Sequence, residues 1–592
     1  MSLMLTAAIV AALPAASARL DAITVTATRR PQAQQRVLAD VSVIERAEIE
    51  ASQAPDLLEL LRWQAGVDLA RTGGSGQSSS LFLRGSNSNH VLFLVDGVRI
   101  ASTNTGAAAF EHLPLDQIER IEIVRGPRAS YYGSDAIGGV IAITTRERQG
   151  AGLLLRAGSQ GRAAGALGYG VSGERGALSL QLGGEHYDGY SAQTPEGFSY
   201  DPDDDGYRNR NLALRGRLQA GSQQLGFSAL ATRADVEFDQ GETAVDQHVL
   251  ALTLDGPLAA DWQHHLSLGS ARDDLLTPVY YARFATRRTQ LDWIHDVGLG
   301  ADQHLVFGLN LQRERGLSAS IGASAPDYAE SLQHRAAFIG WQGSIGNWDQ
   351  ELVLRHDDHE RFGGKATAQA ALGWRFEQGR LYGSWGEGFR APNLNELYSP
   401  GFGGLYAGNA ELAPERSRSL ELGVEATLAS IQWGANVYRT RIDDLIAFEG
   451  AGNFQAINIA RAAIDGLELS AHRQWDQWSA GGQLTWQDAE NARTGTALLR
   501  RPARKAALDV GYRFDGGLQL GADLGYASAR RDVSRELPGY ALIGMRVDWP
   551  LSPQWTLGAR LANASDREYQ WAAGYAAPGR EFIVNLRWEA QP

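Results

Sequence analysis

From about Gln149 to the end of the chain, short segments alternate apolar and polar residues, and polar loops separate them. In 178–183, leucines occupy every second position, and the same alternation recurs in 305–312, 518–525 and 582–588. Successive side chains of a strand point to opposite faces, so each segment predicts a β-strand with one apolar and one polar face. Such strands throughout 149–592 indicate a membrane β-barrel with a wet interior, although a soluble β-sandwich gives the same local pattern.

The first part of the chain has a different, glycine-punctuated texture. In 118–125, Ile121, Ile123 and Arg125 share one face of a predicted strand, and Gly126-Pro127 ends it. Further apolar strands are predicted at 41–44, 81–85, 91–98 and 140–143. Leucines at helical spacing predict a helix over 52–64. The sequence therefore predicts a small domain of mixed strands and helices ahead of the long strand-rich region.

The order of four motifs carries a family resemblance. L-R-G, L-V-D-G-V-R, I-E-R-I-E-I-V-R-G-P and Y-G-S-D-A-I-G-G-V-I follow one another between 83 and 141. This order resembles the plug domain of TonB-dependent outer-membrane receptors, and F-R-A-P-N-L at 389–394 resembles a second signature of that family. Within the family, 125–140 and the run G-G-S-G-Q at 73–77 are most similar to cobalamin receptors.

The resemblance implies a β fold: a 22-stranded antiparallel transmembrane β-barrel closed by an N-terminal α+β plug domain. The plug is expected over 31–148 and the barrel over 149–592, as a monomer that spans the bacterial outer membrane and contacts its lipid. At about 10 residues per spanning strand, 22 strands use about half of the barrel region and leave the rest for turns and loops. A barrel that wide needs a plugged lumen.

The start of the chain predicts export. Residues 1–18 are interpreted as a signal peptide, because 3–13 is apolar and Ala16-Ser17-Ala18 is a small-residue cleavage site. Met1 and Ser2 supply no positive side chain, so a buried helix is the alternative interpretation. The segment 19–30 follows, and its extended, β-branched run can add as a strand to a partner's sheet. It resembles the TonB box, which binds the inner-membrane TonB complex, with these residues: Asp21, Ala22, Ile23, Thr24, Val25, Thr26 and Ala27.

Composition excludes several classes of function. The chain has no cysteine, which excludes disulfides and thiolate metal sites, and its net charge of −13 argues against nucleic-acid binding. No run is long and apolar enough for a transmembrane helix. His264-His265 and the pair His356 and His359 are interpreted as loop histidines, and no cluster of serine, histidine and acid indicates an enzyme.

The resemblance implies TonB-dependent transport of cobalamin (vitamin B12). Cobalamin is bulky and rich in amides, so its site should offer neutral hydrogen-bonding groups. The residues expected to bind it are Thr72, Gln77, Ser78, Ser102, Thr103, Asn104, Thr105 and Phe238. A receptor for a ferric siderophore or another metal chelate is the alternative; it would line its site with arginine or clustered aromatic residues. A passive channel or adhesin is a third possibility, but neither needs a plug or a TonB box.

Two sets of charged residues complete the expectations. Arg84 and Arg125 each end a plug strand, and by the resemblance they should face Glu421 and Glu468 of the barrel.

The second set concerns calcium, a cofactor that the cobalamin-receptor resemblance implies. The loop Asp201 to Gly206 begins like an EF-hand, but its twelfth position is Leu212 and the EF-hand interpretation fails. The resemblance instead assigns calcium to Asp203, Asp205, Asp239 and Asp246. Ser191 stands where that family has an acid, which predicts weaker calcium dependence. A merely solvated acidic loop is the alternative.

Overall fold

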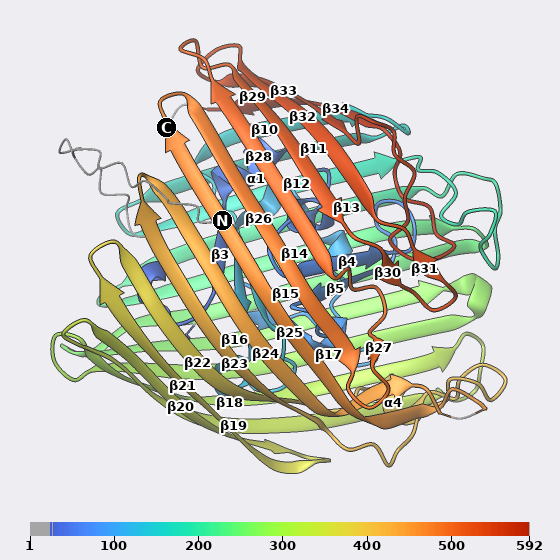
Figure 1. The fold of residues 1–592 in the computed structure, drawn as a ribbon, viewed down its shortest axis with the longest axis horizontal. Coiled ribbons are helices and arrows are strands. Elements are labelled where there is room, and N and C mark those ends of the chain that lie inside the picture. The colour runs from blue at the N-terminus through green and yellow to red at the C-terminus, as the bar shows by residue number, and fades with distance from the viewer. Residues whose placement is uncertain (1–23, 26–27, 451, 591–592) are drawn as a thin grey trace, which may run out of the picture.

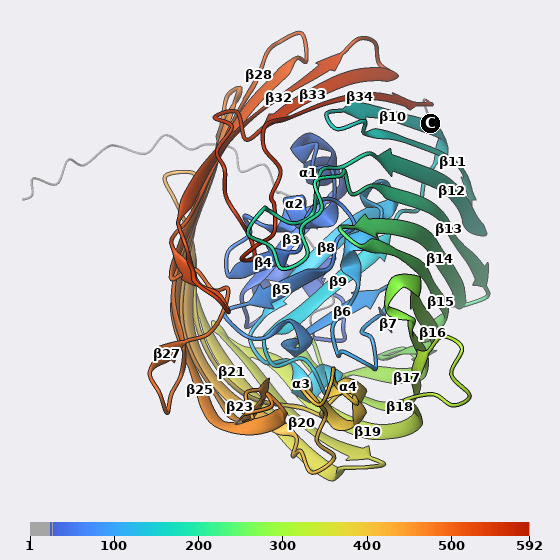
Figure 2. The same ribbon diagram turned by 90° about the vertical axis from the view of Figure 1, so that its right-hand side faces the viewer.

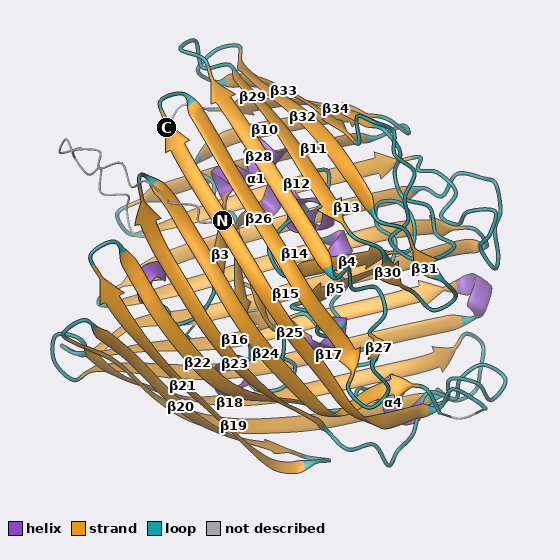
Figure 3. Cartoon of the chain, viewed as in Figure 1, coloured by secondary structure: helices purple, strands orange, loops and turns teal. Residues whose placement is uncertain are grey.

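The structure, a computed structural model, describes residues 24–25, 28–450 and 452–590. Figure 1 shows a wide barrel of strands, and Figure 2 shows a smaller domain enclosed within it. Strands dominate the chain, and helices are few and short (Figure 3). The predicted signal peptide, 1–18, and most of the predicted TonB box lie outside the described residues.

The barrel consists of 22 antiparallel strands, which confirms the predicted fold. In chain order they are β10 (Gly150–Gly158), β11 (Ala163–Gly173), β12 (Gly176–Tyr187), β13 (Tyr207–Ala220), β14 (Gln223–Phe238), β15 (Gly241–Ala259), β16 (Trp262–Thr277), β17 (Ala282–Gly298), β18 (Gln303–Ser320), β19 (Tyr328–Ile345), β20 (Trp348–His359), β21 (Gly363–Phe376), β22 (Gly379–Arg390), β23 (Glu415–Leu428), β24 (Ile431–Phe448), β25 (Ala456–Trp475), β26 (Trp478–Asn491), β28 (Arg504–Arg513), β29 (Gln519–Ala527), β32 (Tyr540–Pro550), β33 (Trp555–Ala562) and β34 (Glu581–Glu589).

Each strand pairs with its sequence neighbour, and the first pairs with the last. β10 and β34 close the barrel with a register that runs from Gly152 opposite Glu589 to Gly158 opposite Ile583. Short strands decorate the connections: β27 (Thr496–Ala497), β30 (Arg530–Arg531) and β31 (Glu536–Leu537). Closure leaves no exposed sheet edge, which is what a β-structure in lipid requires.

The alternation predicted from the sequence sets which side chains face outward. Leu178, Leu180 and Leu182 of β12 are exposed, whereas Ser179 and Gln181 between them are buried. An apolar outer face around a polar interior is the arrangement of a membrane barrel rather than a soluble sandwich.

One end of the barrel carries short turns and the other carries long loops. The turns at 174–175 and 346–347 are examples of the short-turn end, and the loop 391–414 is an example of the long-loop end. Exposed tryptophans gather beside the short turns, at Trp262, Trp293, Trp348, Trp374, Trp433, Trp475, Trp478 and Trp549. Amphipathic rings of this kind concentrate at a membrane–water interface. Among the described residues, no helix is long and apolar enough to cross a membrane.

The enclosed domain is built around a five-stranded sheet in the order β3-β8-β9-β6-β7. Its strands are β3 (Val41–Glu45), β6 (Val91–Val95), β7 (Val98–Arg99), β8 (Ile118–Arg125) and β9 (Gly139–Thr145). β6 and β9 are parallel, and the other neighbours are antiparallel. A hairpin of β4 (Val67–Arg71) and β5 (Ser79–Leu83) lies beside the sheet, with short helices α1 (Arg46–Ser52), α2 (Leu57–Leu61) and α3 (Ala129–Tyr132).

The predicted helix over 52–64 is wrong in its bounds. α1 ends at Ser52, and α2 begins only at Leu57. Pro55 lies between the two helices, where it supplies no N–H donor. Asp56 then caps α2, because its Oδ1 accepts a hydrogen bond of 2.8 Å from the N–H of Glu59.

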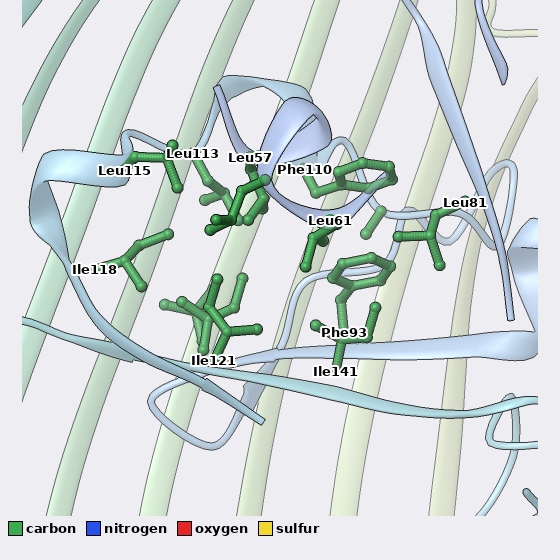
Figure 4. Close-up of a cluster of buried hydrophobic side chains, with 14 of the residues drawn as sticks. Leu57, Leu61, Leu81, Phe93, Phe110, Leu113, Leu115, Ile118, Ile121 and Ile141 are labelled. Carbon is green, nitrogen blue, oxygen red and sulfur yellow. The ribbon is translucent and has the colours of Figure 1, made fainter. Parts of the chain in front are cut away.

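The core of this domain lies between the sheet and α2. Leu57 and Leu61 of α2 pack with Ile121 and Phe93 of the sheet, and Phe93 stacks on Phe110 with ring centroids 4.8 Å apart (Figure 4). Alanines and aliphatic residues of β13 to β16 close the same cluster from the barrel side. The domain is therefore held by the barrel wall as well as by its own core.

Candidate functional site

The plug loop 101–107 meets the long-loop end of the barrel. Ser102, Thr103 and Asn104 are exposed by only 8%, 6% and 1%. The N–H groups of Leu394 and Asn395 donate to the carbonyl oxygens of Thr103 and Asn104, at 3.1 and 2.9 Å. These three predicted ligand residues are thus largely occupied by barrel contacts, and Thr105 of the same loop is exposed.

The helix that docks on this loop is α4 (Leu394–Tyr398), within the segment 391–414. A reciprocal capping box starts it: Asn393 Oδ1 accepts from the N–H of Glu396, and Glu396 Oε2 accepts from the N–H of Asn393. The start of this helix therefore has its backbone donors satisfied both by the cap and by the plug.

A buried charge network fixes α4 to the barrel and to the plug. Arg390 lies 2.9 Å from Glu396 and 2.8 Å from Glu415. His90 Nε2 of the plug lies 2.6 Å from the same Glu415 carboxylate. His90, Arg390 and Glu415 are each at most 1% exposed. The arrangement satisfies charges that would be costly to bury alone.

The second plug loop, 72–78, approaches the loop after β12. Gln77 is buried, and its Nε2 donates to the carbonyl oxygen of Glu237 at 2.5 Å. A Cβ on Gly76 would overlap the ring of Tyr207, so only glycine allows this approach. Thr72 bonds to the carbonyl oxygen of Ser78, and Ser78 itself is exposed. Of the neutral residues predicted to bind ligand, only Ser78 and Thr105 are exposed.

Aromatic residues and an arginine on the long loops were not predicted as site residues. Tyr406 stacks on Phe454 with ring centroids 5.1 Å apart, and the guanidinium of Arg361 lies 5.3 Å from the ring centroid of Tyr398. The predicted residue Phe238 stacks on Tyr280 at 5.7 Å. These groups come from separate loops, so no motif joins them in the sequence. In the sequence, the one indication of these groups was that aromatic residues recur between the predicted strands.

The acidic loop brings some of the predicted calcium ligands together. Asp205 is 4% exposed and accepts a hydrogen bond from the N–H of Ala192, and Asp239 accepts one from the N–H of Asp201. The pKa of Asp205 is raised to about 7. Burial is the largest cause, the hydrogen bond from Ala192 opposes it, and the carboxylates of Asp239 and Asp203 add to it.

Asp246 lies elsewhere. It is on β15, on the same outward face as the exposed Leu250, and it pairs with Arg233 at 3.3 Å and with His248. The structure therefore does not bring the four predicted aspartates together. Within 24–25, 28–450 and 452–590, no group of three or more histidine, cysteine or acidic residues is arranged to hold a metal ion. Calcium binding stays a prediction, restricted to Asp203, Asp205 and Asp239.

The predicted plug–barrel pairs are only partly as expected. Arg84 lies 2.7 Å from Glu468 and 3.1 Å from Glu421. Arg125 pairs instead with Asp40 of the plug at 3.3 Å, and its Nη1 donates to Ser42. Asp40 also pairs with Arg84 at 3.0 Å. Arg125 therefore supports the barrel contact indirectly, through the carboxylate that it shares with Arg84.

Two residues of the predicted TonB box lie within the part of the chain that the structure describes. Thr24 and Val25 form β1 (Thr24–Val25), which pairs with β2 (Gln32–Ala33) through Thr24 opposite Ala33 and Val25 opposite Gln32. The other five residues of the box lie outside the described residues. The pairing of this box with TonB stays a prediction.

Comparison with known proteins identifies both domains. A family model described as "TonB dependent receptor-like, beta-barrel" matches residues 151–564, which is more than half of the chain. A second model, "TonB-dependent Receptor Plug Domain", matches residues 33–140.

Solved structures share the fold at low sequence identity. A mutant of the ferric enterobactin receptor PfeA of Pseudomonas aeruginosa has a TM-score of 0.78 and 20% identity, over 93% of this chain and 98% of that chain. The siderophore receptor PirA of Acinetobacter baumannii has a TM-score of 0.78 and 18% identity, with the same coverage. The FrpB iron transporter of Neisseria meningitidis (F5-1 variant, apoprotein) has a TM-score of 0.80 and 14% identity, over 93% and 99%.

Proposed function

Because this chain belongs to the TonB-dependent receptor family, we propose that it imports a ferric chelate of the siderophore class. The family and the fold make it a transporter of the outer membrane that works with TonB, and not an enzyme. The long-loop end then faces the outside and the short-turn end faces the periplasm. The choice of a ferric chelate replaces cobalamin, which the sequence-based hypothesis favoured.

The choice of ligand rests on where the neutral polar side chains and the aromatic side chains lie. Ser102, Thr103 and Asn104 are buried against the barrel, so they offer little to an amide-rich ligand. The extracellular loops instead carry stacked rings, such as Tyr406 on Phe454, and an arginine, Arg361, beside aromatic rings. Flat aromatic faces and guanidinium groups suit the aromatic, negatively charged chelates that bind iron. The three similar structures, a ferric enterobactin receptor, a siderophore receptor and an iron transporter, support the same class.

A binding panel tests the proposal. Purified receptor is titrated with ferric catecholate, ferric hydroxamate and cobalamin while its tryptophan fluorescence is recorded. We expect saturable binding of one ferric chelate and weaker or no binding of cobalamin. Replacing Tyr406 by alanine should weaken chelate binding, whereas the same change at Tyr512, near the short turns, should leave it unchanged. Tight binding of cobalamin with no ferric chelate bound would restore the cobalamin hypothesis.

A further inference from the structure

Two adjoining cavities lie between the plug and one wall of the barrel. The larger cavity, of about 70 Å³, extends from Ser75 and Gly76 of the plug loop 72–78 to the wall formed by β10 to β13 and β34. The smaller, of about 30 Å³, is bounded by Arg148 and Glu589 near the periplasmic end. The lining residues that both cavities share are Arg46, Glu50, Asp116, Leu154, Ala166 and Arg587. We call the two cavities together the seam, which lies between the plug and the barrel wall formed by β10 to β13 and β34.

The seam follows from small residues on the inner face of β11. Ala164 and Ala166 line the larger cavity, and Gly168 lines the smaller one, whereas Leu167 and Tyr169 point outward and are exposed. No inward side chain among these three positions is longer than a methyl group, which leaves the space that the cavities occupy. Without side-chain contacts across the cavities, the van der Waals attraction between the plug and the wall is weaker there.

The plug face across the seam is polar. Glu111 and Asp116 line the larger cavity, and Glu111 Oε2 and Asp116 Oδ2 have no hydrogen-bond partner among the described residues. Buried polar atoms of this kind are normally satisfied by water. Water between two polar surfaces lets them separate without exposing apolar core.

The plug also bonds to this wall directly. Asn209 Nδ2 of β13 donates to the carbonyl oxygen of His112, and Arg587 Nη1 of β34 donates to the carbonyl oxygen of Glu50, each at 3.1 Å. These bonds have neutral acceptors, so breaking them costs less than separating a buried ion pair.

The opposite wall differs in that it holds the plug through buried ion pairs. Arg84 pairs with Glu421 of β23 and Glu468 of β25, and His90 bonds to Glu415 of β23. On β22, Gly388 lies against the plug so closely that a Cβ placed there would be 3.5 Å from the Cα of Ile137. Breaking buried ion pairs by separation leaves uncompensated charges on both sides.

We propose that the ligand crosses the barrel along this seam, between the plug segment 111–117 and the wall of β10 to β13 and β34. The plug stays anchored to β22, β23 and β25 while the segment moves away from the seam wall. The cavities themselves are far smaller than a ferric chelate, so transport requires this displacement. The proposal rests on the proposed transport function, but it concerns the route and holds for whichever ligand the receptor carries.

Engineered disulfides test the route, because the natural chain has no cysteine to interfere. A Cβ on Gly183 of β12 would lie 3.3 Å from Asp116 Oδ2 and 2.5 Å from Asn211 Oδ1. The double variant Asp116→Cys with Gly183→Cys is therefore placed to bridge the seam once the Asn211 side chain turns aside. The matched control, Ile137→Cys with Gly388→Cys, bridges the anchored wall. Import and surface binding are measured in cells before and after oxidation, with each member of the ferric catecholate, ferric hydroxamate and cobalamin panel that binds the wild type.

Oxidation should abolish import through the seam variant without loss of surface binding, and a reductant should restore it. Oxidation of the control should leave import unchanged. Import that survives the seam cross-link, or that is lost equally in both variants, would overturn the proposal. The binding step separately reports the ligand class, so a failure of the ferric-chelate proposal is recognised as such.

A second variant guards against misfolding of the double mutant. Ala166→Cys lies on the wall in both cavities and is treated with either a small or a bulky thiol reagent after the protein is folded. We expect the bulky adduct to lower import several-fold relative to the small adduct, with surface binding unchanged. Equal import with both adducts would contradict the seam route.

Discussion

Arg84 of the plug lies 2.7 Å from Glu468 of barrel strand β25, and both side chains are at most 5% exposed. These residues are 384 positions apart in the chain. Glu421 and Asp40 complete the surroundings of the guanidinium, at 3.1 and 3.0 Å. One cation thus joins two carboxylates of the barrel to one of the plug. Its removal would leave Glu421 and Glu468 without a cation, whereas Asp40 keeps its pair with Arg125.

The first prediction concerns this anchor. Arg84→Met should destabilise the docked plug by about 3–5 kcal/mol, because it leaves buried carboxylates without their cation. Urea unfolding of detergent-solubilised receptor, followed by a fluorophore on the plug, measures the change. The control is Arg461→Gln, which breaks the exposed pair with Asp443 and should cost about 0–1 kcal/mol. Equal, small effects of both variants would show that lumen solvent screens the Arg84 network.

The second prediction concerns coupling to TonB. Val25→Pro removes a backbone N–H from β1 and fixes φ, so strand pairing with TonB should fail. Import should vanish while ligand binding at the cell surface persists. Val25→Ala keeps the N–H and should import normally. Normal import by the proline variant would show that residues 21–27 do not form the contact with TonB.

The third prediction concerns pH and the acidic loop. The pKa of Asp205 rises from its ordinary value near 4 to about 7 in the folded loop, so folding favours the protonated acid. Its stabilising contribution is therefore complete below the unfolded pKa and is lost as pH rises through about 7. The protection of 188–206 against hydrogen exchange, corrected for the intrinsic rise of exchange with pH, should fall between about pH 4 and about pH 7. Asp205→Asn should flatten this dependence, and an unaltered profile in that variant would assign it to other groups.

The fourth prediction concerns calcium. A divalent cation relieves the same repulsion among Asp203, Asp205 and Asp239 that protonation relieves, because it accepts several carboxylate oxygens. Calcium added after chelator treatment should slow hydrogen exchange in 188–206 at about pH 8, where these acids are charged. Magnesium should act less, since it requires a tighter octahedron. Asp246→Asn should leave the effect intact, because Asp246 pairs with Arg233. Equal exchange rates with calcium and with chelator would show that this loop does not bind calcium.

The sequence by itself determined the architecture. Alternation such as Leu178, Leu180 and Leu182 identified strands with one apolar and one polar face, because a strand places successive side chains on opposite faces whatever its neighbours are. The family resemblance, not the alternation, indicated that the apolar face is the outer one. The plug motifs identified the enclosed domain, and Arg84 was matched to both glutamates that it contacts. These inferences succeeded where local periodicity or a dense motif carries the information.

Only the tertiary structure decided which polar residues remain free to bind a ligand. Ser102 and Asn104 look like solvated loop residues in the sequence, yet Thr286, Tyr328 and α4 occupy them. Asp246 was grouped with the loop aspartates, but strand register turns it to the outer face beside Arg233. The small residues of β11 reveal a gap only once the plug stands opposite them. Each of these outcomes depends on partners far away in the chain, which no local pattern encodes.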